Sequence, residues 1–189
     1  MRPSRDEWGL QLAEVTAQRA TCLRRSVGCV LVDRHGHVLA TGYNGVAAGQ
    51  LHCNELGVRE ATSANPGPVV SPRNLAGRPT TAVAFGVDYR AVSGEVYDYL
   101  HACPGALSPS GTNLDGCGAI HAEQNALLQC RDVQTIETCY VTCSPCLTCV
   151  KMLLNTACRR IVYRERYPHT EALDLWVEAS REHRLLPKV

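Results

Sequence analysis

The chain has 189 residues, a length that suits one domain, and 45% of them are hydrophobic, enough for a sizeable core. Its 19 basic and 18 acidic side chains leave a net charge of +1, so it lacks the basic field on which non-specific nucleic-acid binding depends. We expect no membrane span, because no run of about 18 apolar residues is present.

The cysteines and the first residues of the chain both bear on its compartment. Residues 1–7 lack the apolar core of a signal peptide, so we expect a cytoplasmic protein. Eleven cysteines in such a protein indicate metal ligands and buried thiols rather than disulfides. Five of them lie at apolar positions and are expected in the core: Cys29, Cys130, Cys139, Cys143 and Cys158.

The first elements are a helix and a hairpin. Apolar residues at helical spacing predict an amphipathic helix over 6–20, with Trp8, Leu12 and Val15 facing the core. The apolar run over 27–32 predicts a strand buried on both faces. A turn over 33–36 then leads into a returning strand over 37–42, and the two strands form an antiparallel hairpin.

Residues 44–118 are the least regular part of the chain. Four prolines among Gly, Ser, Thr and Asn break helices and strands alike: Pro66, Pro68, Pro72 and Pro79. We expect only a strand over 81–87 and a short helix over 92–101. An irregular stretch of this length is unusual in a compact domain and is often functional.

Regular structure resumes at Ile120. We expect helices over 121–130, 146–155 and 170–179, strands over 137–142 and 160–163, and an edge strand at 185–186. Alternating strands and helices predict an α/β fold with three α/β/α layers. Because the first two strands are antiparallel, the central sheet of about five strands is mixed. We expect residues 1–189 to form a single domain.

Two short motifs in the second half carry the chemistry. His121-Ala122-Glu123 is followed by Pro145-Cys146-Leu147-Thr148-Cys149. His121, Cys146 and Cys149 provide three nitrogen or sulfur ligands for zinc, and a catalytic zinc keeps its fourth position open for water. Glu123 need not join the metal and is free to move protons. The alternatives are a closed zinc knuckle, or a buried cysteine pair with an unrelated His-Ala-Glu.

The cysteine pair is expected at the start of a helix. Pro145 suits the first helical position, and Ser144 is then the N-cap. Cys146 and Cys149, three residues apart, share one face of that first turn. The helix N-terminus also favours their thiolate forms.

The order of motifs resembles the deoxycytidylate (dCMP) deaminase family of the cytidine-deaminase-like superfamily. The segments that carry the resemblance are Thr21–Arg25, Val27–Gly28, Gly42–Gly45, His52–Cys53, His121–Ala126, Tyr140–Thr142, Pro145–Cys149, Ile161–Tyr163 and Tyr167. They cover the first 53 residues and residues 117–167. The resemblance therefore implies a long insertion at about 54–116, where the family is variable.

This resemblance implies the zinc-dependent hydrolysis of dCMP to dUMP and ammonia. Glu123 would take a proton from a zinc-bound water and deliver protons to the ring nitrogen and the leaving amine. The Ala122 N–H and the carbonyl near Ser144 would bind the pyrimidine edge. Asn44 would bind the sugar, unless it is only a turn residue. The candidates for the phosphate site are Arg24, Arg25 and Tyr167, although the arginines also suit a solvated face.

The resemblance also implies partners and a second metal. Family members often bind dCTP, with Mg²⁺, as activator and dTTP as inhibitor between the subunits of a homohexamer. Tyr43, Asn44 and Gly45 would belong to that site. A structural zinc would be held by Cys22, Cys53, Cys103 and Cys117, with His101 as a further candidate. Free buried thiols are the alternative.

Other functions remain open at this stage. The substrate could be a modified dCMP (5-methyl or 5-hydroxymethyl), a free nucleoside or another base. A polynucleotide cytosine or adenine deaminase needs a basic, aromatic surface, and a net charge of +1 with one Phe argues against it. A non-enzymatic zinc module for assembly or DNA uptake has no use for Glu123.

Overall fold

The computed structural model describes residues 2–50, 52–53, 56–60, 89–90, 96–101, 109, 111–112 and 117–188, with only the backbone given for 56–60, 89–90 and 96–101. The elements in chain order are α1 (Arg5–Ala17), β1 (Gly28–Val32), β2 (Val38–Tyr43), β3 (Gly45–Val46), β4 (Leu56–Glu60), β5 (Tyr89–Arg90), β6 (Val96–His101), β7 (Ala119–Ile120), α2 (Ala122–Gln129), η2 (Val133–Thr135), β8 (Thr138–Cys143), α3 (Leu147–Leu154), β9 (Arg160–Glu165), α4 (Glu171–Glu178) and β10 (Glu182–Leu185).

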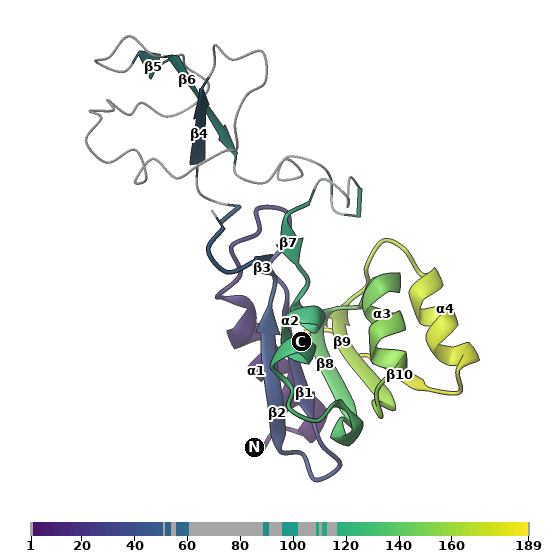
Figure 1. Cartoon of the computed structure of the whole chain (residues 1–189). Coiled ribbons are helices and arrows are strands. Elements are labelled where there is room, and N and C mark those ends of the chain that lie inside the picture. The colour runs from purple at the N-terminus through teal and green to yellow at the C-terminus, as the bar shows by residue number, and fades with distance from the viewer. Residues whose placement is uncertain are drawn as a thin grey trace.

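The central sheet has five strands in the order β10-β9-β8-β1-β2 (Figure 1). β1 is antiparallel to both β2 and β8, whereas β8, β9 and β10 are parallel. The predicted mixed sheet and its first hairpin are therefore confirmed. β10 is the expected edge strand, although it begins at Glu182, earlier than the sequence suggested.

Helices cover both faces of this sheet, which confirms the three-layer fold. α1 lies on one face and α2, α3 and α4 on the other (Figure 1). Successive residues of a strand point to opposite faces. Val30 and Val162 therefore pack with Leu10 of α1, while Leu31 and Ile161 pack in the larger core beneath the other three helices. All five residues of β1 are buried, as expected.

The first helix forms where it was predicted, but its buried face was predicted wrongly. Trp8 and Val15 are 39% and 62% exposed, and the face toward the sheet consists of small residues around Leu10 and Ala13. The helix lies so close to β1 that a Cβ on Gly28 would overlap the Ala13 carbonyl oxygen. Only a narrow side of the helix fits this spacing, so the large Trp8 side chain is left outside.

The insertion contains a sheet that the sequence did not predict. β4, β6 and β5 form a three-stranded antiparallel sheet. The helix expected over 92–101 is wrong, because Val96–His101 is the middle strand of this sheet. Its Val96 and the alternate residues Tyr97 and Tyr99 are of types that favour strands. The strand expected over 81–87 lies outside the described residues.

The segments on either side of the insertion pair with each other. β3 and β7 pair through Gly45 with Ile120 and Val46 with Ala119. This two-stranded ladder joins the segment after β2 to the segment that leads into α2. Among the residues that the structure describes, no helix is long and apolar enough to cross a membrane.

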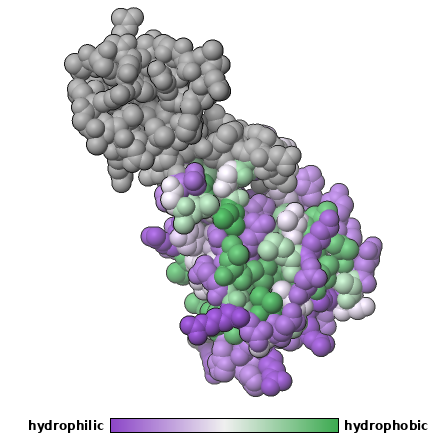
Figure 2. All heavy atoms as spheres, in the orientation of Figure 1, coloured by the Kyte–Doolittle hydropathy of each residue, from purple (hydrophilic) through white to green (hydrophobic). Residues whose placement is uncertain are grey.

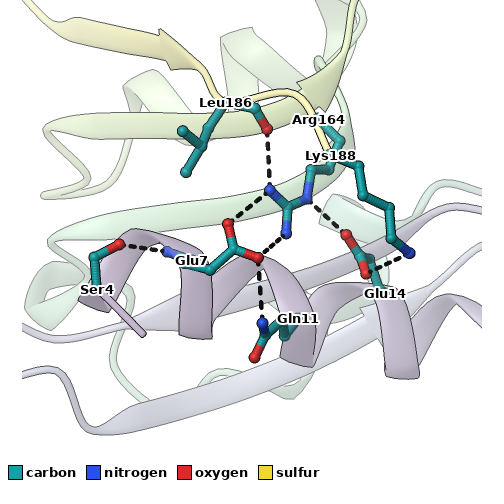
Figure 3. A network of polar contacts seen from close by, with 7 residues as sticks. All are labelled: Ser4, Glu7, Gln11, Glu14, Arg164, Leu186 and Lys188. Carbon is teal, nitrogen blue, oxygen red and sulfur yellow. Dashed lines mark hydrogen bonds and ion pairs between the residues drawn. The ribbon is translucent and has the colours of Figure 1, made fainter. Parts of the chain in front are cut away.

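Arg164 on β9 ties the N-terminal helix and the C-terminal segment to the sheet (Figure 3). Its guanidinium makes two hydrogen bonds to the Glu7 carboxylate, at 2.6 and 3.0 Å, and a third to Glu14 at 2.6 Å. It also donates to the Leu186 carbonyl at 3.1 Å. The Arg164 side chain is only 6% exposed, so its charge depends on these acceptors. Pairing with Arg164 lowers the pKa of Glu7.

We predict that Arg164→Met lowers the free energy of unfolding by about 3 kcal/mol, because removing one member of a buried ion network leaves the others unpaired. The measurement is urea denaturation at neutral pH. The matched control is Lys188→Met, since Lys188 also contacts Glu14 but is 78% exposed, and its loss should cost less than about 1 kcal/mol. Equal effects of the two variants would contradict a dominant role for Arg164.

Candidate metal centre and substrate cleft

His121, Cys146 and Cys149 converge at the starts of α2 and α3. The His121 Nδ1 atom lies 3.3 Å from Cys146 Sγ and 3.5 Å from Cys149 Sγ. Tetrahedral zinc, with Zn–N near 2.0 Å and Zn–S near 2.3 Å, requires its ligand atoms to lie roughly 3.5–3.8 Å apart. All three ligand atoms lie within 4.8 Å of one another, so the residues fit a zinc ion.

Local structure explains how these ligands are presented. Cys146 is the N-cap of α3, and Cys149 lies one turn into the helix. The expectation that Ser144 caps this helix is wrong, because the Ser144 hydroxyl instead accepts the backbone N–H of Tyr167 at 2.7 Å. His121 is the N-cap of α2, and its backbone N–H donates to the Gln124 side chain at 2.9 Å. Each ligand is thus fixed by a helix start.

The electrostatics of the centre suit a metal and a proton carrier. Hydrogen bonds from Cys149 and His121 lower the pKa of Cys146 to about 4, so this thiol is a thiolate at neutral pH. Glu123, in the first turn of α2, is only 4% exposed. Burial raises its pKa to about 7. Its carboxyl group lies in the cleft beside the ligands and is not one of them.

A cleft opens beside these residues and collects most of the predicted site. Its lining residues come from separate stretches of the chain: Cys22, Arg24, Arg25, Val27, Asn44, Gly111, Cys117, Ala119, His121, Ala122, Glu123, Cys143, Ser144, Cys146 and Tyr167. Arg24, Arg25, Asn44, Ala122 and Tyr167 are therefore brought together with Glu123. Their roles toward a ligand remain predictions.

Asn44 lines the cleft and also makes hydrogen bonds to the backbone beside it. Its side-chain oxygen accepts the Val27 N–H at 2.8 Å, and its amide donates to the Arg25 carbonyl at 2.7 Å. It is 7% exposed. Asn44 is therefore more than a turn residue, since it holds the arginine segment against the end of β2.

The two arginines are held in different ways. The Arg24 guanidinium donates to the Thr112 carbonyl at 2.7 Å, which brings the far end of the insertion to the cleft. Arg25 donates to Cys143 Sγ at 2.8 Å and lies 3.5 Å from the exposed Glu165 carboxylate. Neither arginine is a fully solvated side chain.

Two features of the cleft were not predicted from the sequence. Cys143 was expected in the core, and although it is buried, it lines the cleft and accepts a hydrogen bond from Arg25. Its place at the end of β8, directly before Ser144, was the available signal. Gly111 also lines the cleft, but no local pattern connects the insertion with Tyr167 or Arg24.

The proposed ligands of a second zinc are only partly described. Cys22 and Cys117 line the cleft. Cys53 is fully buried in a small cluster with Val46, Cys117 and Ala119, and Cys103 lies outside the described residues. Within the described ranges, only the group formed by His121, Cys146 and Cys149 meets the geometry for a metal ion.

Tyr43 and Gly45 flank Asn44 as expected from the sequence. The Tyr43 carbonyl accepts the Asn125 side-chain amide of α2 at 2.8 Å. Gly45 is buried in β3, where it pairs with Ile120. Both residues thus connect the end of β2 to the start of α2.

A mixed five-stranded sheet between helical layers, with a His/Cys/Cys centre at two helix starts, defines a cytidine-deaminase-like protein. The crystal structure of dCMP deaminase from the cyanophage S-TIM5 in complex with dCMP and dUMP has this fold, with a TM-score of 0.60, 22% sequence identity and coverage of 98% of this chain and 99% of that one. Residues 3–165 match the model of the cytidine and deoxycytidylate deaminase zinc-binding region, and the chain belongs to this family.

Curated relatives agree with this assignment. The deoxycytidylate deaminase of Mycobacterium phage D29 is 34% identical over 164 residues, which cover 86% of this chain and 95% of the phage protein. That of Schizosaccharomyces pombe is 30% identical over 177 residues, 91% of this chain. The chain spans 41% and 39% of the lengths of the fission-yeast and budding-yeast deoxycytidylate deaminases.

We predict that Cys149→Ser lowers the zinc content by about one ion per chain, because a neutral hydroxyl replaces a thiolate ligand. The measurement is elemental analysis of the purified protein after dialysis. Cys130→Ser is the matched control, because Cys130 is a half-buried thiol outside the ligand group. Loss of zinc from both variants, or from neither, would contradict the assigned ligands.

Proposed function

We propose that the protein hydrolyses dCMP to dUMP and ammonia. The observation that carries the proposal is the single cleft in which Glu123 and the metal ligands face Arg24 and Arg25. A base-deaminating centre beside two guanidiniums suits a pyrimidine that carries a phosphate. The names of the relatives from yeast and phage support the same substrate.

Zinc, when bound, would supply a water of lowered pKa and a Lewis acid. Glu123 then moves both protons of the attacking water, one to the ring nitrogen and, after the oxygen has bonded to the ring carbon, the other to the amine that departs as ammonia. Its position supports this role, because it is buried beside the metal ligands but is not one of them. The protein thus provides one carboxyl group for every proton transfer.

Groups around the cleft orient the nucleotide. The backbone N–H of Ala122 and the carbonyl near Ser144 bind the edge of the pyrimidine. The Asn44 side-chain oxygen accepts the Val27 N–H, and one of its amide hydrogens is donated to the Arg25 carbonyl. A primary amide carries two hydrogens, so one remains to donate to the sugar.

The phosphate binds at Arg24, Arg25 and Tyr167. Among the described residues, Arg24 bonds to a backbone carbonyl and to no carboxylate, so its charge is not neutralised there. A guanidinium can also bind phosphate oxygens in a bidentate way. Tyr167, on the segment after β9, also lines the cleft.

We predict that the purified protein releases ammonia from dCMP and that Glu123→Gln lowers the rate by about 10²–10⁴-fold, the usual contribution of general acid–base catalysis. The variant should keep its zinc, because Glu123 is not a ligand. A coupled ammonia assay measures the rate, and elemental analysis measures the metal. Parallel assays use deoxycytidine, 5-methyl-dCMP and a short single-stranded DNA.

Two outcomes of this experiment would contradict the proposal. Turnover of the DNA but not of dCMP would show that the substrate is a polynucleotide and not a free nucleotide. Undiminished turnover by Glu123→Gln would remove this residue from the proton transfers. A preference for 5-methyl-dCMP over dCMP would keep the reaction and change the substrate.

We also predict that Arg24→Gln lowers kcat/KM for dCMP by about 10–100-fold, because a hydrogen bond to a charged group is lost. Deoxycytidine has no phosphate and therefore has no such hydrogen bond to lose, so its kcat/KM should change by less than about twofold. Arg159→Gln is the control, since Arg159 is exposed and outside the cleft. An equal loss of kcat/KM on both substrates would contradict the phosphate contact, because the substitution would then affect folding or the binding of the base.

Finer features of the protein extend this proposal. We propose that dCTP with Mg²⁺, and dTTP, bind as effectors near Tyr43, Asn44 and Gly45, and that residues 1–189 act as a single cytoplasmic domain with an insertion at about 54–116. A second zinc at Cys22, Cys53, Cys103 and Cys117 is supported by the contact between buried Cys53 and Cys117. Elemental analysis of the unaltered protein tests this second site, because two zinc ions per chain are expected with it and one without it.

A homohexamer is part of the same proposal. Figure 2 shows apolar surface gathered over the face that α2 covers, with polar surface around it. Leu128 of α2 is 73% exposed and Val38 of β2 is 43% exposed. Apolar surface of this kind often marks a contact between subunits.

A further inference from the structure

We propose a second ligand site, for a nucleotide that carries several phosphates, in a hollow between the start of α1 and the β1–β2 turn. The site lies at the other end of the sheet from the cleft. Val27, directly before β1, lines the cleft, whereas Val32, the last residue of β1, lines the hollow. Five strand intervals separate them by roughly 16 Å. In Figure 1 the N-terminus and this turn lie together, away from β3 and β7.

The hollow has the size of a small-molecule site. Its volume is about 430 Å³, and ligand pockets commonly enclose about 300–1,000 Å³. The residues that line it are Arg2, Pro3, Ser4, Arg5, Trp8, Val32, His35, Gly36 and Tyr140. Two aromatic rings and two guanidiniums therefore surround one space.

Trp8 provides an aromatic face that the core does not use. It is 39% exposed, whereas Trp176, the other tryptophan, is fully buried and donates its indole N–H to the Glu182 carbonyl. Within the described ranges the Trp8 indole N–H makes no hydrogen bond. An exposed indole ring can stack on a nucleobase, and such stacking tolerates any base.

Arg2 and Arg5 provide positive charge that the described part of the chain does not neutralise. Both are exposed and, among the described residues, neither forms a hydrogen bond or an ion pair. The nearby basic residues differ in this respect, because Arg160 and Arg184 both contact the Asp6 carboxylate. Two unpaired guanidiniums suit phosphate oxygens, which they bind in a planar, bidentate way.

The acidic groups close to the hollow are already engaged. Asp6 accepts hydrogen bonds from Arg160, Arg184 and the Tyr140 hydroxyl. Asp33 accepts the backbone N–H groups of His35 and His37 within the turn. The charge that remains for a ligand is therefore positive, which favours phosphate over a cation.

An aromatic face beside unpaired guanidiniums matches a base joined to a chain of phosphates. This inference does not depend on the reaction in the cleft, because none of its residues lines the cleft. It also differs from the effector site proposed at residues 43–45, which lies at the other end of β2 from the turn.

The test uses dTTP, which has no amino group for hydrolysis, and follows tryptophan fluorescence at fixed ionic strength. We expect dTTP to quench the emission of the unaltered protein. In Trp8→Phe the remaining Trp176 is buried, so the quenching should disappear. Equilibrium dialysis with labelled dTTP then resolves the binding sites. The dissociation constant that matches the quenching curve should rise about tenfold or more in Trp8→Ala, the size of a lost stacking contact, and similarly in the Arg2→Ala/Arg5→Ala double variant, whereas a site at residues 43–45 keeps its own constant.

The controls test for a general effect of surface charge and for loss of folding. Arg19→Ala removes an exposed arginine beyond the far end of α1, and it should leave the dissociation constant unchanged. The melting temperature of each variant verifies folding. Undiminished quenching in Trp8→Phe, inorganic triphosphate binding as tightly as dTTP, or binding of single-stranded DNA without binding of dTTP would each overturn the proposal. Activity on dCMP does not enter the measurement.

Discussion

The close packing of α2 against β2 is the constraint on which the metal centre depends. A Cβ on Gly42 would overlap the Ala122 carbonyl and the Ala126 backbone, so the start of this helix lies directly on the strand. The bond from Asn125 to the Tyr43 carbonyl fixes the same contact. His121, as the N-cap, is thereby held at the end of the sheet, where α3 presents the two cysteines.

Several polar side chains of the cleft have a structural partner as well as a proposed role toward substrate. Asn44 holds the arginine segment, and the Ser144 hydroxyl holds the chain at Tyr167. Bonds of this kind fix the cleft before a ligand arrives, which reduces the cost of ordering it on binding. The same sheet that presents this cleft at one end exposes Trp8 beside the turn at its other end.

Much of the fold followed from local patterns. The hairpin, the three helices after Ile120 and the three layers were all predicted, because apolar periodicity reports directly on burial. The buried face of α1 was not, since its orientation depends on how closely Gly28 allows the helix to approach. The helix expected at 92–101 is a strand, because its pairing with β4 and β5 is not visible in its own sequence.

The sequence by itself determined that His121, Cys146 and Cys149 are candidates for holding zinc, with Glu123 close to them, because their spacing is local and zinc accepts few kinds of ligand. Only the tertiary structure decided that Cys143 borders the cleft, that Thr112 binds Arg24, and that Ser144 binds Tyr167 instead of capping a helix. Each of these contacts joins segments more than 20 residues apart. Such contacts depend on how strands and helices are arranged in space, which a local pattern does not encode.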